Sequence, residues 1–205
     1  MLVKLYEKDT NLTTTREVVE LLRKDAVIII PTDTVYAFAC SLNSAKAFDR
    51  MAKLKGVKPE KANFSLICSD LSHIADYSKI NNATFKLMKK ALPGPFTFIL
   101  NATNNVPKLF KSNKKTIGIR IPENNIALTL VKELGQPLVV TSVLDDDDVI
   151  EYTTNPELIE EKYSHQVEAV IDGGYGNNEA STILDCTGNG IEIIRQGIGN
   201  LEDFA

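Results

Sequence analysis

The 205-residue chain has no tryptophan, two histidines and three cysteines, and it has no apolar run near the roughly 20 residues that span a membrane. Cys40, Cys68 and Cys186 are odd in number and widely spaced, with neither a C-x-x-C pair nor zinc-ligand spacing. We expect them to be buried, reduced thiols, and we expect no metal site. The first residues are charged and lack the apolar core of a signal peptide. These absences predict a cytoplasmic protein without a membrane segment.

Several catalytic patterns are missing too. His73 and His165 lie far apart without a neighbouring nucleophile pattern, which argues against Ser-His-Asp and Cys-His enzymes. Neither G-x-x-x-x-G-K-[ST] nor G-x-G-x-x-G occurs, so no P-loop or Rossmann phosphate site is encoded. The net charge of −4 excludes a basic surface overall, so any nucleotide or RNA contact must be local. The four aspartates at 145–148 have the charge for a hard cation, but such crowding is more typical of a solvated loop.

What the chain does contain is a regular alternation of short β-rich runs with amphipathic stretches, undivided by repeats or linkers. Period-two and apolar runs predict strands at 26–31, 64–68, 96–101, 116–121, 138–142, 168–172, 182–185 and 191–195. Caps and helical periodicity predict helices at 13–24, 44–54 (capped by Ser44), 85–91 (capped by Asn82 or Thr84), 126–134 (after Asn125, ending at Gly135) and 156–163 (Pro156 first). The connection 101–115, interrupted by Pro107, does not fit a crossover helix and indicates some antiparallel pairing. We therefore predict an α/β or α+β fold with one large mixed sheet.

The first predicted strand stops abruptly at Pro31-Thr32-Asp33-Thr34, where hydroxyl and carboxylate groups follow a continuous apolar run. In open α/β sheets, ligands bind beyond the carboxyl ends of strands, so the segment is a candidate site. The alternative is a strand-ending turn in which Asp33 and the threonines bond local backbone groups. The sequence alone favours the turn.

Two further segments carry local positive charge. The stretch 53–61 holds four lysines where a helix is predicted to end, which suits either phosphate binding or a solvated helix terminus. In the strand 116–121, alternation places Thr116, Gly118 and Arg120 on one face and the isoleucines on the other. The Arg120 guanidinium is thus expected to face an acidic group, either a structural carboxylate or a ligand.

Near the end of the chain, the runs 181–185 and 191–197 predict a hairpin. Arg195 precedes Gly197 by two residues, and a glycine there permits close approach of the backbone to a ligand or a neighbouring loop.

Taken together, these motifs resemble the YrdC/YciO family. The resemblance rests on P-T-D-T-V-Y at 31–36, P-G-P-F-T at 93–97, I-G-I-R-I-P at 117–122, Thr141-Ser142, and S-T-I-L-D at 181–185 followed by R-Q-G at 195–197. It covers nearly the whole chain, and we assign residues 9–199 to a single YrdC-like domain and 200–205 to a short tail. It implies a large twisted sheet, mixed parallel and antiparallel, flanked by helices and enclosing a locally positive cleft.

The family resemblance also implies a reaction and a set of site residues. Its best-understood members are L-threonylcarbamoyladenylate synthases, which use ATP, bicarbonate and L-threonine to make the donor for threonylcarbamoyladenosine in tRNA. By analogy, the threonine end would be formed by Thr34 or Thr32, Arg120, Thr141 and Ser181. The nucleotide would lie along Lys55, Lys58, Thr116, Ser142 and Arg195, with Mg²⁺ accompanying ATP. No covalent nucleophile or catalytic base is implied, because positioning and charge stabilisation carry the chemistry.

Two departures from the synthases resemble the YciO branch instead. The synthases have K-x-R before a proline where this chain has Gly56-Val57-Lys58, and S-x-N where it has Ser142-Val143-Leu144. Lys58 is only a point charge, and Leu144 has no amide, so two charge-assisted contacts worth roughly 1.5–3 kcal/mol each are lost. Weak or altered synthase activity is expected.

Two alternatives remain open. One is a non-catalytic module that binds tRNA or double-stranded RNA through lysines of the cleft, with strongly salt-dependent affinity. The other is the same chemistry on an amino acid other than threonine, which the change to Leu144 permits.

Overall fold

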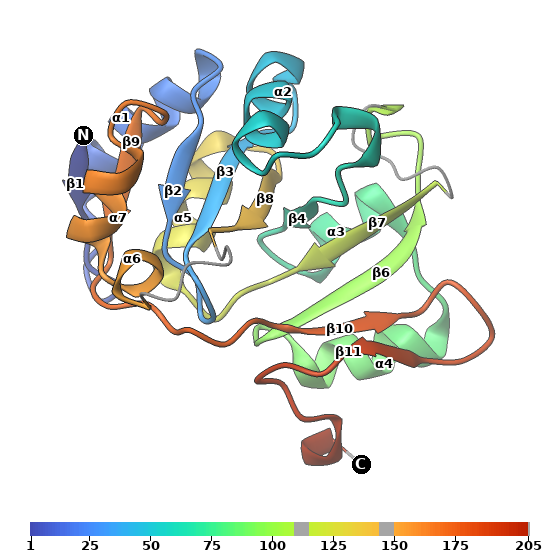
Figure 1. The fold of residues 1–205 in the computed structure, drawn as a ribbon. Helices are drawn as coiled ribbons and strands as arrows, with labels where there is room; N and C mark the ends of the chain where they lie inside the picture. Colours follow the sequence, from blue (N-terminus) through green and yellow to red (C-terminus); the bar gives the residue numbers. More distant parts are fainter. Residues whose placement is uncertain (109–114, 144–149, 205) are drawn as a thin grey trace.

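The computed structural model describes residues 1–108, 115–143 and 150–204, and these residues form one large sheet with helices on both faces (Figure 1). The strands are β1 (Leu2–Lys4), β2 (Ile28–Ile30), β3 (Ala37–Ser41), β4 (Ser65–Ile67), β5 (Ser78–Lys79), β6 (Phe96–Ala102), β7 (Thr116–Arg120), β8 (Leu138–Ser142), β9 (Ala169–Asp172), β10 (Thr182–Asp185) and β11 (Glu192–Arg195). The helices are α1 (Leu12–Arg23), α2 (Ala45–Leu54), α3 (Leu71–Tyr77), α4 (Asn82–Ala91), α5 (Asn125–Leu134), α6 (Glu151–Thr154) and α7 (Pro156–Tyr163), with short 3₁₀ turns at Pro59–Lys61 and Leu201–Phe204.

The sheet is mixed, as predicted. Its order is β1-β9-β2-β3-β8-β4-β7-β6-β10-β11, and β5 pairs with β6. Parallel pairs (β1–β9, β9–β2, β4–β7, β6–β10) occur beside antiparallel ones. The predicted hairpin is the antiparallel pair β10–β11, and the irregular connection after β6 joins two antiparallel strands, β6 and β7. The strands twist strongly, so that β6, β7 and β10 cross the direction of β2 and β3 (Figure 1).

The helices begin where polar side chains accept backbone hydrogen bonds. Asn11, Ser44, Asn81, Asn124 and Asn155 cap α1, α2, α4, α5 and α7, each through a side-chain oxygen. Ser44 is the predicted cap, whereas the caps of α4 and α5 are Asn81 and Asn124 and not the predicted Asn82 or Thr84 and Asn125. As predicted, α5 ends at Gly135, which adopts a left-handed conformation.

Two apolar cores lie on opposite faces of the sheet. In β2, Ile29 belongs to the core under α2, α3, α4 and α7, while Ile28 and Ile30 belong to the core under α1 and α5. The same alternation continues through β3 and β8. A continuous apolar run such as 26–30 is therefore buried on both faces, as is typical of strands covered by helices on both sides.

The helices α1 and α5 cover only part of their face. Their core takes residues from β2, β3, β8 and β9 and reaches β4 only at Ile67, whereas Ser65 and Gly118 on that face line a hollow. This half-open face positions the candidate site.

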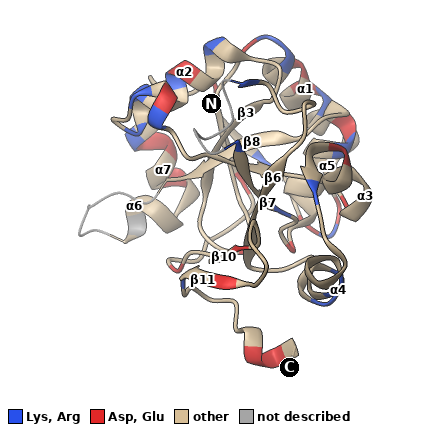
Figure 2. Cartoon of the chain, turned by 90° about the vertical axis from the view of Figure 1, so that its right-hand side faces the viewer, with Lys and Arg blue, Asp and Glu red and all other residues tan. Residues whose placement is uncertain are grey.

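Basic and acidic residues are interspersed on α1 and α2, so the outer surface of these helices has no single sign of charge (Figure 2). Within the described residues, every helix is too short or too polar to span a bilayer.

Candidate functional site

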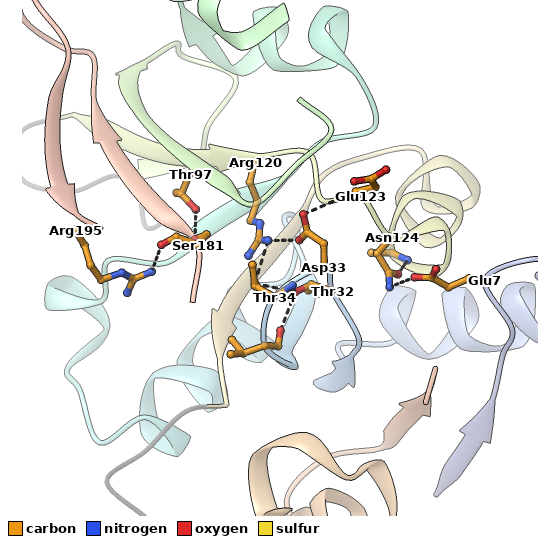
Figure 3. A network of polar contacts seen from close by, with 12 residues as sticks. Glu7, Thr32, Asp33, Thr34, Thr97, Arg120, Glu123, Asn124, Ser181 and Arg195 are labelled. Atoms are coloured by element: carbon orange, nitrogen blue, oxygen red, sulfur yellow. Dashed lines mark hydrogen bonds and ion pairs between the residues drawn. The ribbon is translucent and has the colours of Figure 1, made fainter. Parts of the chain in front are cut away.

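The turn after β2 is held by its own threonines. Thr32 Oγ1 donates to the Val35 carbonyl at 2.8 Å and accepts the Thr34 amide at 3.1 Å, and the two threonine hydroxyls are 3.1 Å apart. Thr34 is fully buried and Thr32 is nearly so. The turn chemistry expected from the sequence is therefore present. The same turn also places Asp33 and Thr34 against Arg120 of β7, so it belongs to the candidate site as well (Figure 3).

Arg120 reaches this turn from the end of β7. Its Nη2 donates to Asp33 Oδ1 at 2.5 Å and to Thr34 Oγ1 at 3.2 Å, while Asp33 Oδ2 accepts the Glu123 amide at 3.0 Å. Burial lowers the pKa of Arg120, the Asp33 carboxylate opposes that change, and the positive charge of Arg195 adds to it. Asp33 is thus the acidic group that Arg120 was expected to face. In the described part of the chain, the buried Nε of Arg120 has no hydrogen-bond partner, so the guanidinium retains a donor for another acceptor.

A second polar group stands at the start of β10. Thr97 Oγ1 and Ser181 Oγ lie 2.9 Å apart, both buried, and Arg195 Nη2 donates to the Ser181 carbonyl at 2.8 Å (Figure 3). Gly197 packs so closely on this segment that a Cβ there would lie 2.1 Å from the Ala180 carbonyl oxygen. The close approach predicted for Gly197 is therefore to a neighbouring loop.

Strand register arranges these side chains in two rows on the half-open face. In one row, Thr97 pairs with Ile183 and Ile183 with Arg195. In the other, Ser65 pairs with Gly118, Gly118 with Ile99 and Ile99 with Asp185. The two rows are two residues apart along each strand, which corresponds to a distance of about 7 Å.

Two connected hollows lie over these rows. The small pocket, about 140 Å³, has both arginines in its lining, and the large pocket, about 630 Å³, lies over Gly118, Ile99 and Ile183. Asn63, Ser65, Thr97 and Ile183 line both hollows, which therefore form one cleft. Gly118 is part of its floor, where a Cβ would lie 2.7 Å from Ser65 Oγ.

The structure brings most of the predicted site residues into this cleft. The small pocket is lined by Thr34, Arg120, Thr141, Ser142, Ser181 and Arg195, and the large pocket by Thr116. Thr32 lines a separate, outer hollow of about 550 Å³ on the other side of the turn.

The predicted lysines are placed differently. Lys55 is the C-cap of α2 and Lys58 is exposed before the 3₁₀ turn, and neither lines the cleft. The lysine that lines the cleft is Lys61, three residues after Lys58. Leu144 and the aspartates 145–148 lie outside the described residues.

Sequence reasoning missed three polar members of the cleft, Asn63, Ser65 and Thr97. Thr97 belongs to the P-G-P-F-T motif but was not assigned to the site, and Ser65 is marked only by the period-two alternation of β4, which does not say which face of a strand is open. All three cysteines are free and buried, as predicted. Burial raises the pKa of the Cys40 thiol, which is thereby kept protonated. Among the described residues, no group of three His, Cys, Asp or Glu side chains is arranged to hold a metal ion.

Comparison with known proteins connects this chain with a family. A family model named for Sua5, YciO and YrdC, and described as telomere recombination, matches residues 20–197. A protein of Haemophilus influenzae is 40% identical over 189 residues, which cover 92% of this chain and 91% of that protein. Escherichia coli YciO is 38% identical over 190 residues, with the same coverage. A mouse threonylcarbamoyl-AMP synthase is 29% identical over 190 residues, 89% of this chain and 66% of the synthase.

Solved structures agree with the sequence relationship. The crystal structure of E. coli YciO superposes with a TM-score of 0.92 at 34% identity and covers 100% of this chain and 99% of YciO. P. abyssi Sua5 in complex with L-threonine has a TM-score of 0.88 at 22% identity, over 100% of this chain and 59% of Sua5, which shows a common fold. The chain therefore belongs to the Sua5/YciO/YrdC family, as its motifs predicted.

Proposed function

We propose that the cleft binds ATP and L-threonine and forms L-threonylcarbamoyladenylate, with weak or altered activity, in support of tRNA modification. One observation carries the proposal. Arg120 and Arg195 both line one small pocket, together with Thr34, Ser142 and Ser181. Relatives of this chain include threonylcarbamoyl-AMP synthases, and P. abyssi Sua5 was crystallised with L-threonine.

The two arginines are suited to two different anions. Arg120 is buried and already paired with Asp33, but its free Nε can donate to the carboxylate of an amino acid. Arg195 is exposed and bonds only a backbone carbonyl among the described residues, so its charge is available to a phosphate. An amino acid at Arg120 and a nucleotide at Arg195 would meet inside the small pocket.

The proposed chemistry follows from this arrangement. The amine of threonine attacks bicarbonate to give a carbamate, with loss of water. A carbamate oxygen then attacks the α-phosphorus of ATP, and the bond to pyrophosphate breaks. Bound reactants need only be oriented and their negative charge stabilised, so no side chain has to act as a nucleophile. Mg²⁺ would arrive on the phosphates, because it usually keeps several waters and few protein ligands.

The lysines support the expectation of weak activity. Lys58, the residue in place of an arginine before Pro59, is exposed and does not line the cleft, and the lysine of this stretch that does line it is Lys61. A single ammonium group cannot bind a phosphate bidentately as a guanidinium does. Stabilisation of the leaving pyrophosphate is accordingly reduced.

Pyrophosphate release with ATP, bicarbonate and L-threonine tests the proposal, together with calorimetric titration of ATP. We expect slow, threonine-dependent release in the wild-type protein and none in the Arg195→Met variant. The matched control is Arg16→Met, which removes an exposed guanidinium from α1 and should leave release unchanged. Failure of the wild-type protein both to bind ATP and to release pyrophosphate would refute the proposal. Release with another amino acid but not with threonine would replace the substrate and keep the chemistry.

A second candidate function is RNA binding at the mouth of the cleft. Lys61 lines the cleft, and Lys53 and Lys58 are exposed on the preceding segment, in α2 and just before the 3₁₀ turn. Phosphate contacts by these lysines would make affinity for tRNA or double-stranded RNA fall steeply with salt. Filter binding at low and physiological salt tests this, with Lys61→Gln as the variant and Lys86→Gln on the distant helix α4 as its control. Salt-independent affinity would exclude the RNA function.

A further inference from the structure

Strand β11 forms one edge of the sheet, and its side chains are apolar for an exposed edge. β10 is its only partner strand among the described residues, so its outer row of backbone N–H and C=O groups has no strand beside it there (Figure 1). Ile191, Ile193 and Ile194 are 41%, 48% and 52% exposed. Soluble proteins commonly protect such an edge with lysine or proline, and residues 191–196 contain neither. This edge therefore has the properties of a strand that pairs with another chain.

A register shift gives β11 a symmetric charge pattern. Residues 183, 184 and 185 of β10 pair in turn with Arg195, Ile193 and Glu192, and Ile194 is left without a partner of its own. Ile194 and Arg195 thus share one position, as in a β-bulge. In a regular strand, residues three apart would point to opposite faces. Because of the bulge, Glu192 and Arg195 instead stand on the same face of the sheet, one position to either side of Ile193.

We propose that β11 pairs with β11 of a second copy of this chain, antiparallel and about a two-fold axis at Ile193. In this register the Ile193 side chains of the two copies lie opposite each other, on the face away from the cleft. Glu192 of each copy lies opposite Arg195 of the other, on the face of the cleft. Opposite charges at directly opposed positions stabilise a strand pair, and apolar side chains there bury each other. A second copy fits this edge because the pattern of carboxylate, isoleucine and guanidinium is its own complement.

The contact closes on itself as a dimer. A two-fold pairing occupies β11 of both copies, and the opposite edge strand, β1 (Leu2–Lys4), has a lysine and no carboxylate, so it lacks the self-complementary pattern. Arg195 also lines the small pocket, so each copy would place a carboxylate beside the cleft of the other. The association goes beyond the proposed chemistry and can be measured whatever the cleft binds.

Exchange of the two charges is the first test, with sedimentation equilibrium from micromolar to millimolar concentration as the measurement. We expect the wild-type chain to change from monomer to dimer over this range. Glu192→Arg and Arg195→Glu should each weaken dimerisation at least about tenfold, because two attractive pairs become repulsive. An equimolar mixture of these two variants should dimerise, since the carboxylates of one face the guanidinium groups of the other. A wild-type chain that is monomeric throughout, or a mixture that associates no better than its components, would overturn the proposal.

Disulfide cross-linking tests the register, because the three native cysteines are buried. Ile193→Cys would place two thiols directly opposite each other at the axis, with Cβ atoms about 5 Å apart, and should give a covalent dimer under mild oxidation. The matched control is Ile191→Cys, which is on the same face and 41% exposed. Its two thiols would be about 13 Å apart along the strands, so it should cross-link much more slowly. Equal yields from the two variants, or none from Ile193→Cys, would contradict an axis at Ile193.

A charge on each edge strand separates this contact from general edge effects. Ile193→Lys places two ammonium groups opposite each other and should abolish the dimer, whereas Leu2→Lys on β1, where the leucine is 39% exposed, should leave it unchanged. Far-UV circular dichroism checks that both variants are folded. Equal loss of dimer in both, or in neither, would show that β11 is not the contact.

Discussion

The buried pair Asp33–Arg120 leads to a quantitative prediction about stability. Both side chains are 9% exposed, and their oxygen and nitrogen are 2.5 Å apart. Asp33→Ala leaves the guanidinium without its carboxylate and the Glu123 amide without its acceptor. Removing one member of a buried pair typically costs about 3–5 kcal/mol, because the remaining charge is poorly solvated. We expect about 3 kcal/mol, since Thr34 still accepts a hydrogen bond from Arg120.

A double-mutant cycle isolates the pair from the packing of its members. Arg120→Met removes the charge, keeps much of the aliphatic length, and should cost about 2 kcal/mol because the carboxylate keeps only its bond to Glu123. The double variant buries no charge, so its loss should be smaller than the sum of the single losses by about 2 kcal/mol. Urea unfolding followed by far-UV circular dichroism measures all four free energies.

An exposed pair in the same chain is the control for this cycle. Arg16 and Glu133 are 2.9 Å apart, but the arginine is 67% exposed. The same substitutions there should show a coupling below about 0.5 kcal/mol. Additive losses at Asp33 and Arg120, within about 0.5 kcal/mol, would refute the view that burial makes this pair interdependent.

Three further predictions concern the cleft floor, a buried hydroxyl and a half-buried imidazole. Gly118→Ala should lower ATP affinity at least tenfold by filling the floor, yet cost only about 1 kcal/mol in unfolding free energy, because the obstructing atom is the rotatable hydroxyl of Ser65. Tyr36→Phe should cost about 1–3 kcal/mol in urea unfolding, since the buried hydroxyl donates to the Gly174 carbonyl at 2.6 Å. Burial lowers the pKa of His73 in the folded protein, so near pH 6.5, the usual pKa of histidine, the unfolded chain binds more protons than the folded one. The free energy of unfolding should therefore fall from pH 7 to pH 5, and His73→Gln should flatten that fall.

Each of these variants has a counterpart elsewhere in the chain. Gly188→Ala adds a methyl group in open space, Tyr6→Phe removes an exposed hydroxyl, and His165→Gln removes an exposed imidazole. If these controls matched their partners in ligand affinity, unfolding free energy or pH profile, the effects would not arise from the cleft or from burial.

Much of the fold is predictable because its signals are local. All eight predicted strands and all five predicted helices occur, with shifts of a few residues at their ends. The strands β1, β3 and β5 and the helices α3 and α6 were not predicted. The run Ala37–Ser41 of β3 is buried on both faces and follows directly on a turn, so it has neither alternation nor a boundary of its own. Two- or three-residue strands such as β5 and β1 are too short for periodicity to mark.

The candidate site was predictable only where a family motif marks it. Arg120, Ser181 and Arg195 were expected to converge and do so. Ser65 and Gly118 become neighbours through the parallel pairing of β4 and β7, which are separated by about 50 residues of chain, and no local pattern encodes that register. The lysine in the cleft lining is Lys61, which ends the 3₁₀ turn that begins at Pro59, whereas Lys58 lies before that turn.

The open half of the sheet has a consequence for how this cleft can change. Its floor consists of hydrogen-bonded strands, so the backbone beneath a ligand is ordered before the ligand arrives, and little conformational entropy is lost on binding. Insertions in a surface loop can reshape a loop-built site, but here they would leave the floor untouched. The shape of the floor would change instead through substitutions at alternate strand positions, or through loss of Ile194, the one residue of β11 that has no partner in β10 where the register shifts. A deletion of Ile194 would leave Arg195 opposite Ile183 and Ile193 opposite Leu184, so it would remove one apolar side chain from the cleft wall without turning its neighbours to the other face.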